Sequence, residues 1–359
     1  MPSESTIPVR VFGGQGYVAG EVLRLLALHP AVHVACVSTT SQAGESVVGA
    51  FPHLAGTRLD GIRFVDQEEA ATAGWVKGRV EAMIFATPHG ATSALIDRAL
   101  TAAESAGAHA HAIDLSADYR FRDADVYASI YGKPHAAPHR LSEFVSTVPE
   151  FHRGATPRHA AQPGCFTTAA TTAAYPFVKA GIVEGPIFVA AITGSSGSGR
   201  TPVAGTHHPE RAHNLYAYNA LAHRHEREMR GILGAAAPNG QEPDVEFVPH
   251  SGPFVRGIHA TVRMTMKSES TAETAAKIAA DAYEGSPFVR VGTSPPKLTE
   301  VVATNRVRLG IAVRGRTLVV TSVIDNLTKG AAGGGIQWMN RVLGLPESTG
   351  LLIPGPGWI

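Results

Sequence analysis

The sequence lacks the features that mark secreted, membrane or nucleic-acid-binding proteins. Its two cysteines, Cys36 and Cys165, are far apart, so neither a disulfide framework nor a cysteine zinc cluster is expected. Apolar runs such as 187–192 are too short to span a bilayer, and residues 1–8 have no signal-peptide core. A formal net charge of +1 leaves no basic surplus for nucleic acid or an anionic membrane. We therefore expect a cytoplasmic protein with no nucleic-acid or membrane partner.

The composition is that of a folded globular chain. Hydrophobic residues make up 44% and charged residues 17% of the 359 positions. This length predicts two domains and supports a large core without disulfides or structural metal.

The first half alternates between strand and helix patterns. A β-branched run at 9–12 ends at Gly13, and apolar residues then recur at helical spacing until His29-Pro30. Further strands are predicted at 32–37, 82–86 and 112–115, with His109-Ala110-His111 interpreted as a solvated loop. This order predicts a doubly wound parallel sheet.

The second half indicates a mixed or antiparallel sheet. The strand-like segments are 187–193, 244–249, 257–266, 306–314 and 316–324, with one helix at 271–283. A glycine-rich stretch, 330–335, follows the last strand and precedes an apolar helical pattern that ends near Leu343. Close backbone contact explains this stretch better than a flexible linker does.

Gly13, Gly16 and Gly20 lie between the first strand and the first helix. Glycines there permit a tight turn and a close approach of backbone amides to a pyrophosphate at a helix N-terminus. An ordinary tight turn is the alternative, but the strand and helix on either side favour a nucleotide.

The end of the second strand bears on the type of nucleotide. Ser38, Thr39 and Ser41 supply hydroxyls, and no carboxylate occurs before Glu45. Enzymes that use NAD usually have a carboxylate here for the ribose hydroxyl, and this carboxylate would repel a 2′-phosphate. The segment therefore favours NADP over NAD.

Cys165 follows Pro163-Gly164 and begins a Thr/Ala-rich helical segment that continues to about Pro176. A sulfur at a helix N-terminus is favoured as thiolate, which is the nucleophilic form. Cys36 lies inside an apolar strand and fits the commoner role of an inert buried thiol.

Histidines that could transfer a proton to or from the thiol occur at His207-His208 and at His223-Arg224-His225. His223 and His225 open a helix, and being two residues apart they cannot both face one point. A zinc site built from these four histidines is the rival hypothesis, but no carboxylate or cysteine stands at ligand spacing. We expect no metal.

Several motifs in order carry a family resemblance. They are Gly13-Gly14-Gln15-Gly16-Tyr17, Thr87-Pro88-His89-Gly90, Ile113-Asp114-Leu115-Ser116-Ala117-Asp118-Tyr119-Arg120, Val148-Pro149-Glu150-Phe151, Pro163-Gly164-Cys165-Phe166, residues 193–199, His223-Arg224-His225, Arg256-Gly257-Ile258 and residues 324–331. Over nearly its whole length the chain resembles the N-acetyl-gamma-glutamyl-phosphate reductases and, more distantly, the aspartate-semialdehyde dehydrogenases.

This resemblance implies an α/β fold in two parts. A Rossmann-type domain would comprise residues 1–164 and 326–359, with the C-terminal helix returning to it, and an α+β substrate and dimerisation domain would comprise 165–325. It also implies a homodimer or homotetramer. Cys165 would be the nucleophile and His223, rather than His225, the acid/base. NADPH would reduce an N-acyl-γ-glutamyl phosphate, most simply N-acetyl, to the semialdehyde through a Cys165 thioester, as in arginine biosynthesis.

The resemblance also assigns binding residues. Those expected to bind the cofactor are Gly13, Gln15, Gly16, Tyr17, Ser38, Thr39, Ser41, Pro88, Ser195, Gly197, Asn326, Lys329 and Gly330. Those expected to bind the substrate are Ser116, Arg120, Gly164, Glu210 and Arg256.

The chain also departs from the family pattern. Residues 207–214 resemble relatives that take N-succinyl or carrier-linked aminoadipyl phosphates, and a basic residue common near 38–41 is absent. The alternatives are therefore the same chemistry on one of those substrates, an NADP-binding regulator without chemistry, and a zinc hydrolase built on the histidines.

Overall fold

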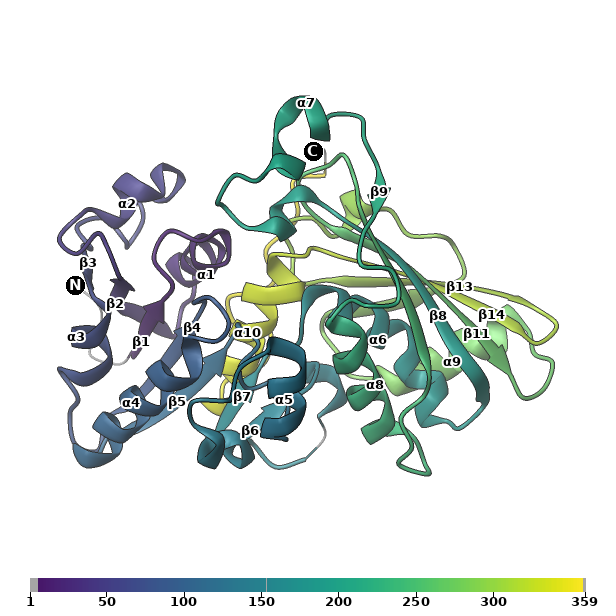
Figure 1. Ribbon diagram of the computed structural model, residues 1–359, viewed down its shortest axis with the longest axis horizontal. Helices are drawn as coiled ribbons and strands as arrows, with labels where there is room; N and C mark the ends of the chain where they lie inside the picture. Colours follow the sequence, from purple (N-terminus) through teal and green to yellow (C-terminus); the bar gives the residue numbers. More distant parts are fainter. Residues whose placement is uncertain (1–5, 153, 358–359) are drawn as a thin grey trace. The chain divides into compact units, whose positions relative to one another are not determined.

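The computed structural model describes residues 6–152 and 154–357, which form two compact units (Figure 1). The first unit contains the described residues up to Pro163 together with Ala331–Leu352. The second contains Gly164–Gly330 and the described residues after Leu352. Residues 326–330 and the end of the chain thus cluster with the second unit, whereas the sequence-based division placed them with the first.

The first unit is built on a seven-stranded parallel sheet with the order β3-β2-β1-β4-β5-β7-β6. Its strands are β1 (Ile7–Phe12), β2 (Val32–Thr39), β3 (Phe64–Asp66), β4 (Val80–Phe85), β5 (His109–Asp114), β6 (Phe144–Ser146) and β7 (His159–Ala161). The fold confirms the four predicted strands; β3, β6 and β7 are too short to show a periodic pattern. The loop predicted at 109–111 was wrong, because β5 begins at His109.

The helices of the first unit include one from the C-terminal end of the chain. They are α1 (Tyr17–Ala27), α2 (Val47–Ala50), α3 (Gln67–Thr72), α4 (Thr92–Ser105), α5 (Ala124–Tyr131) and α10 (Gly333–Val342). α10 lies against β5 and β7. A Cβ on Gly334 would be 2.6 Å from Gln162 Cδ, and one on Gly335 would be 2.4 Å from Leu115 Cδ2. This part of the glycine-rich stretch is therefore a close contact and not a linker.

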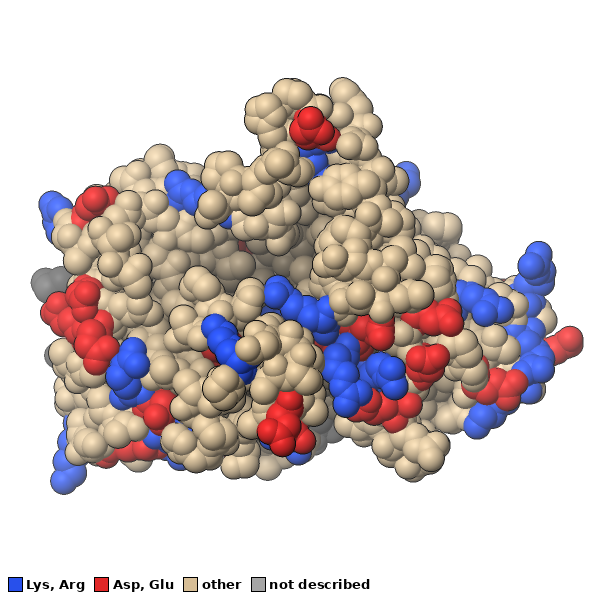
Figure 2. All heavy atoms as spheres, in the orientation of Figure 1, with Lys and Arg blue, Asp and Glu red and all other residues tan. Residues whose placement is uncertain are grey.

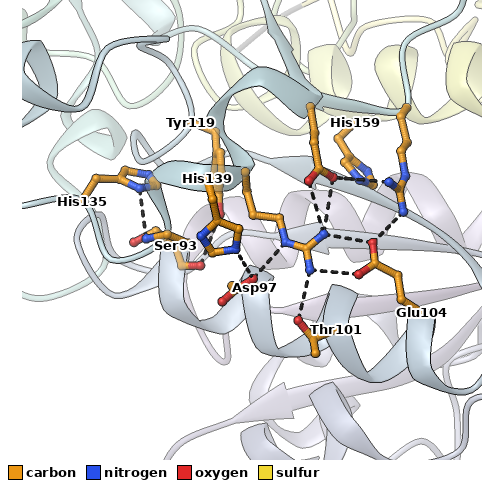
Figure 3. A network of polar contacts seen from close by, with 12 residues as sticks. Ser93, Asp97, Thr101, Glu104, Tyr119, His135, His139 and His159 are labelled. Atoms are coloured by element: carbon orange, nitrogen blue, oxygen red, sulfur yellow. Dashed lines mark hydrogen bonds and ion pairs between the residues drawn. The ribbon is translucent and has the colours of Figure 1, made fainter.

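A buried arginine ties α4 to the segment that leads into β6 (Figure 3). Arg140 Nε donates to Asp97 (2.8 Å), Nη1 and Nη2 donate to Glu104 (2.9 and 3.0 Å), and Nη2 also reaches Thr101 (3.0 Å). Glu143 lies 3.3 Å from Nη1. We call these five residues the Arg140 network. Three carboxylates and a hydroxyl surround the guanidinium, so it can remain buried.

The second unit is built on a seven-stranded mixed sheet with the order β12-β13-β14-β11-β8-β10-β9. Its strands are β8 (Val183–Thr193), β9 (Tyr216–Ala217), β10 (Val245–Ser251), β11 (Ile258–Met266), β12 (Val289–Gly292), β13 (Val307–Arg314) and β14 (Thr317–Ile324). Its helices are α6 (Cys165–Lys179), α7 (His208–Arg211), α8 (His225–Ala236) and α9 (Ala272–Ala282). Figure 1 shows α6, α8 and α9 on one face of this sheet. The predicted strands and the predicted helix are all present.

α6 is the central helix of this unit, and nearly all of its residues after Cys165 are buried. Thr168, Thr171 and Thr172 bond their hydroxyls to carbonyls one turn back. Pro176 lies inside the helix and cannot donate to the carbonyl of Thr172, but the Tyr283 hydroxyl does so at 2.6 Å. The helix that begins at Cys165 is therefore long and buried, and the carbonyl that Pro176 cannot serve has another donor.

Candidate active site

The loop after β1 is shaped as a cradle for an anion. Gly13 has φ +150°, and a Cβ there would be 2.8 Å from the Ala86 carbonyl oxygen. Gly14 has φ +54° and donates to the Ser38 carbonyl (3.0 Å). Gly16 is the N-cap of α1 and has no side chain to accept from the first-turn amides. A side chain would be strained at Gly13 and Gly14, and the helix N-terminus that Gly16 leaves open suits a pyrophosphate.

The position of this loop in the sheet supports the same assignment. β1 lies between β2 and β4, so successive connections leave it in opposite directions, which is where such sheets bind ligands. Gln15 and Tyr17 belong to the loop and to the first turn of α1, and Pro88 follows the neighbouring strand β4. Gly20, the third glycine predicted, has another reason: a Cβ there would be 2.7 Å from the Phe51 ring.

The hydroxyls at the end of β2 differ in their environment. Ser38 is 1% exposed, Thr39 Oγ1 accepts from the Ser41 amide (3.3 Å), and Ser41 is exposed. The turn therefore presents Ser41 and backbone to solvent, whereas Ser38 is in the interior.

Two aspartates order the segment that follows β5. Asp114 accepts from the Ser116 and Tyr119 amides, and burial, assisted by the charge of Asp118, raises the pKa of Asp114 to about 6. Asp118 caps α4 by accepting from the Thr92 and Ser93 amides. This brings two predicted substrate residues, Ser116 and Arg120, into an ordered loop.

Arg120 also reaches the segment before the nucleophile. Its Nε donates to the Gln162 carbonyl at 2.9 Å. It therefore holds the backbone directly before Pro163 and Gly164.

In the second unit, Cys165 is the first residue of α6 and is half-buried. The preceding Gly164 amide donates to Glu228 Oε2 (2.8 Å), which also accepts from Thr167 Oγ1 (3.0 Å). A Cβ on Gly330 would be 2.7 Å from Cys165 Cβ. Cys165 thus follows a backbone amide that Glu228 holds in place, and Gly330 packs against it on another side. By contrast, burial raises the pKa of the Cys36 thiol to about 11, which keeps it protonated.

The two histidines of the His-Arg-His motif have different environments. His223 Nδ1 accepts from the His225 amide (3.2 Å), so this ring is held at the start of α8. Burial and then the charge of Arg224 lower the pKa of His223 to about 4. His225 Nε2 lies 2.3 Å from the point where a Cβ on Gly164 would be and 4.0 Å from Glu228 Oε1. His225 therefore lies directly over the residue before the nucleophile, which explains why residue 164 is glycine.

Sequence reasoning missed two further residues of this site. Glu228 anchors the Gly164 amide, and its place three residues after His225 on α8 is a signal that was available. Burial and then the negative charge of Cys165 raise the pKa of Tyr218, so its hydroxyl lies within electrostatic range of the sulfur. Tyr218 stands outside any regular element and gave no signal.

The residues predicted from the later motifs form a support around the same helix start. Arg256 makes a two-point ion pair with buried Asp325 (2.9 and 3.0 Å) and also donates to Thr328 (3.0 Å). Asn326 accepts from the Gly257 amide (2.7 Å) and donates to Ser196 (3.0 Å). These contacts shape the turn that brings Gly330 against Cys165.

The remaining residues predicted from these motifs make fewer of the contacts that support the start of α6. Ser195 and Gly197 belong to a short 3-10 turn, Ser195–Ser198, that follows β8, and Gly197 is exposed. Lys329 is fully buried, with Nζ 5.5 Å from the Phe288 ring centroid.

Glu210 belongs to α7 and, with His207 and Tyr216, lines an open pocket of about 580 Å³. Among the described residues, no three His, Cys, Asp or Glu side chains gather into a metal-binding group. Within the same residues, no helix combines the length and apolarity needed to cross a bilayer.

Comparison with known proteins agrees with this arrangement. Residues 8–157 match the semialdehyde dehydrogenase NAD binding domain, and residues 165–326 match the semialdehyde dehydrogenase dimerisation domain. Aspartate semialdehyde dehydrogenase II of Vibrio cholerae has a TM-score of 0.67 at 18% identity, covering 94% of this chain and 98% of its own. The fold and the site thus define a nicotinamide-dependent enzyme of the semialdehyde dehydrogenase class.

Sequence relatives identify the family within this class. The N-acetyl-gamma-glutamyl-phosphate reductase of Symbiobacterium thermophilum is 40% identical, covering 98% of this chain and 99% of its own. The enzymes of the same name from Pseudomonas fluorescens (strain SBW25) and Methanopyrus kandleri are each 38% identical, covering 96% and 97% of this chain and 98% and 99% of their own. The chain belongs to the N-acetyl-gamma-glutamyl-phosphate reductase family, as the sequence motifs predicted.

Proposed function

We propose that this protein reduces an N-acyl-γ-glutamyl phosphate, with N-acetyl as the acyl group, to the semialdehyde and phosphate, as in arginine biosynthesis. The observation that carries the proposal is the arrangement at the start of α6. A half-buried cysteine begins a long helix, and an imidazole with a nearby carboxylate lies over the preceding glycine. Family membership supplies the substrate class.

The chemistry follows from the groups present. Cys165 as thiolate attacks the acyl carbon, the bond to phosphate breaks, and a thioester forms on the sulfur. The nicotinamide cofactor, when bound, supplies the hydride that reduces this thioester. Collapse of the resulting thiohemiacetal releases the aldehyde and returns the thiol. The Cys165 backbone amide at the helix start can donate to the oxygen that gains charge.

We assign to His225 the transfer of a proton to and from the oxygen of the thiohemiacetal. His223 uses Nδ1 to accept from a backbone amide, and its pKa, lowered to about 4 by burial, leaves the ring without a proton to donate at neutral pH. His225 has its Nε2 over Gly164, with Glu228 close enough to stabilise a charged ring. The sequence favoured His223; the choice between the two rings remains a prediction, and these contacts support His225.

NADP is the proposed cofactor. The glycine loop fits a dinucleotide, and Ser41 with the adjoining backbone offers donors where a carboxylate would oppose the 2′-phosphate. Gly13, Gln15, Gly16, Tyr17 and Pro88 would bind the remainder. We propose a homodimer or homotetramer formed through the dimerisation domain. The cytoplasmic location stays a prediction.

The test is the reverse reaction with purified protein, phosphate, and NADP or NAD. The semialdehydes of N-acetylglutamate, N-succinylglutamate, aspartate and aminoadipate are compared by kcat/KM. We expect the highest kcat/KM with the N-acetyl compound and a higher kcat/KM with NADP than with NAD. Preference for another acyl group would retain the chemistry and change the substrate.

A protein that binds NADP but oxidises none of the four semialdehydes would contradict the enzyme proposal. It would then favour the regulator hypothesis.

A further inference from the structure

Arg211, the last residue of α7, is a buried cation with donors to spare. It is 7% exposed, and its Nη1 donates to Ser251 Oγ at 2.8 Å. Among the described residues, its Nε and Nη2 have no hydrogen-bond partner. An arginine stays charged at any working pH, and a buried charge without its counterpart is unfavourable. Fold stability alone does not explain this side chain.

The open edge of the guanidinium has a specific shape. Nε and Nη2 form one side of the planar group and point two parallel N–H bonds in the same direction. This two-donor edge matches the two oxygens of a carboxylate. The third nitrogen, Nη1, is held by Ser251, so the orientation of the edge is set. The side chain is therefore prepared for a planar anion.

Arg211 also lies beside the pair of strands formed by β9 and β10. Its guanidinium lies 6.0 Å from the ring centroid of Tyr216, and Tyr216 pairs with Ser251 where β9 meets β10. Two residues further on, the hydroxyl of Tyr218 is influenced by the charges of both Cys165 and Arg211. Tyr218 is therefore within electrostatic range of both the sulfur and Arg211.

The surroundings leave space for a small molecule. The pocket of about 580 Å³ is lined by Glu210, the neighbour of Arg211 in the chain, and by Tyr216. Figure 2 shows few charged side chains on the surface around α7 at the top of this view. The two nitrogens that have no partner among the described residues belong to a side chain that is largely buried next to this pocket.

We propose that Arg211 binds the α-carboxylate of the N-acyl amino acid substrate and thereby sets specificity. This rests on the proposed function. The substrate has two anionic groups, and its phosphate is attached to the carbon that Cys165 attacks. Three carbons separate that carbon from the α-carboxylate, which suits a cation that shares Tyr218 with the sulfur as a neighbour in electrostatic range. Arg211 is a specificity residue and takes no part in proton transfer.

The first experiment compares two aldehydes in the reverse reaction. N-acetylglutamate semialdehyde carries the α-carboxylate, and 4-acetamidobutanal is the same molecule without it. For Arg211→Met we expect kcat/KM to fall about 10- to 100-fold with the first aldehyde, mainly through KM, and to change less than about twofold with the second. Arg211→Lys keeps the charge without the two-donor edge and should fall between. Arg314→Met, an exposed arginine of the same unit, is the control and should match the native protein.

Equal losses with both aldehydes would indicate a structural role and overturn the proposal. A raised KM for phosphate with an unchanged KM for the aldehyde would do the same, since Arg211 would then bind the phosphate.

A second measurement does not depend on turnover. N-acetyl-L-norvaline keeps the α-carboxylate and lacks the reacting group, so its binding can be measured by calorimetry. We expect binding to the native protein and to Arg314→Met, and at least about tenfold weaker binding to Arg211→Met. Absence of binding to the native protein, or equal binding to all three, would overturn the proposal. If the native protein oxidises no semialdehyde, the proposed function fails, and this titration still decides the role of Arg211.

Discussion

The Arg140 network of the first unit and the Cys165 site of the second are both polar clusters with little exposure, yet they are built differently. In the network, the guanidinium meets three carboxylates and a hydroxyl, with its closest contacts at 2.8–3.0 Å. The hydrogen bond from Arg140 is the main reason why the pKa of Glu104 is lowered. Charge there is neutralised on the spot, which favours stability.

At the Cys165 site, Glu228 accepts from a backbone amide and a hydroxyl, and its distance to the nearest imidazole is 4.0 Å. The thiol lies at the start of α6, and the imidazole of His225 lies over the preceding Gly164. Polar and charged residues in the Arg140 network stabilise the fold, because opposite charges are in contact there. We expect those of the Cys165 site to serve catalysis, which needs a proton that can still be transferred. The predictions below test this contrast.

The largest effect is expected for Cys165→Ser. A serine hydroxyl does not ionise at neutral pH, so turnover should fall by at least about 10³-fold, whereas the free energy of unfolding should change by less than about 1 kcal/mol. Steady-state kinetics and denaturant unfolding measure the two quantities. Cys36→Ser is the control and should stay active, and appreciable turnover by Cys165→Ser would end the thioester mechanism.

The two histidines should separate chemistry from structure. We expect His225→Ala to lower kcat by about 10²- to 10⁴-fold. His223→Ala should lower kcat less than about tenfold and cost about 1 kcal/mol of unfolding free energy, because the His225 amide loses its acceptor. In His223→Asn the side-chain oxygen can replace Nδ1 and restore stability. A larger loss of kcat for His223→Ala than for His225→Ala would return the acid/base role to His223.

Arg140→Met should lower stability and leave activity unchanged, which is the reverse of the result expected for Cys165→Ser. Loss of a buried ion-pair partner usually costs about 3–5 kcal/mol, and we expect about 2–3 kcal/mol here because the carboxylates are 24–38% exposed. Activity per folded molecule should be kept. The control is Arg98→Met, whose ion pair with Glu68 is exposed on both sides and should contribute less than about 1 kcal/mol. Equal losses of unfolding free energy in the two variants would show that the Arg140 network stabilises the fold no more than an exposed ion pair does.

The smallest effect is the pH dependence that His159, beside the network, gives to stability. Its Nδ1 accepts from the Ala112 amide, and burial, assisted by the charge of Arg158, lowers its pKa from 6.5 to about 3. The unfolded chain therefore binds the extra proton between these values. Stability from this group is full above pH 6.5 and is lost as the pH falls towards 3. From pH 7 to 5 we expect a loss of about 1–2 kcal/mol in the native protein.

His159→Gln should lack this part of the pH dependence, and His139→Gln, at an exposed ring, should keep it. Denaturant unfolding at several pH values measures both. The same slope in all three proteins would show that other groups cause the loss.

Much of the site could be predicted from local signals. Pro163-Gly164 before a Thr/Ala run predicted a helix start at Cys165, and Gly13 and Gly16 after a strand predicted the cradle. The glycine-rich stretch predicted close contact, which the structure shows at Gly334 and Gly335. Such signals work because glycine, proline and helix ends act on the backbone within a few residues.

The identity of the partners could not be predicted in this way. Glu228 and Gly164 are 64 residues apart, and Arg256 and Asp325 are 69 apart, so no periodic pattern connects them. Which of His223 and His225 lies over Gly164 depends on how α8 is rotated against α6. That rotation is decided by side-chain contacts from the whole unit.

The sequence by itself determined where the chain turns, where helices begin and that Cys165 begins one of them, because these depend on backbone preferences and short-range periodicity. Only the tertiary structure decided that Arg140 meets carboxylates, whereas two nitrogens of Arg211 have no hydrogen-bond partner in the described part of the chain. Both are arginines in a polar stretch of sequence. They differ because the folded chain brings distant carboxylates within hydrogen-bond distance of Arg140. A hydrogen bond needs a separation of about 3 Å, and the sequence separation of two residues does not encode that distance.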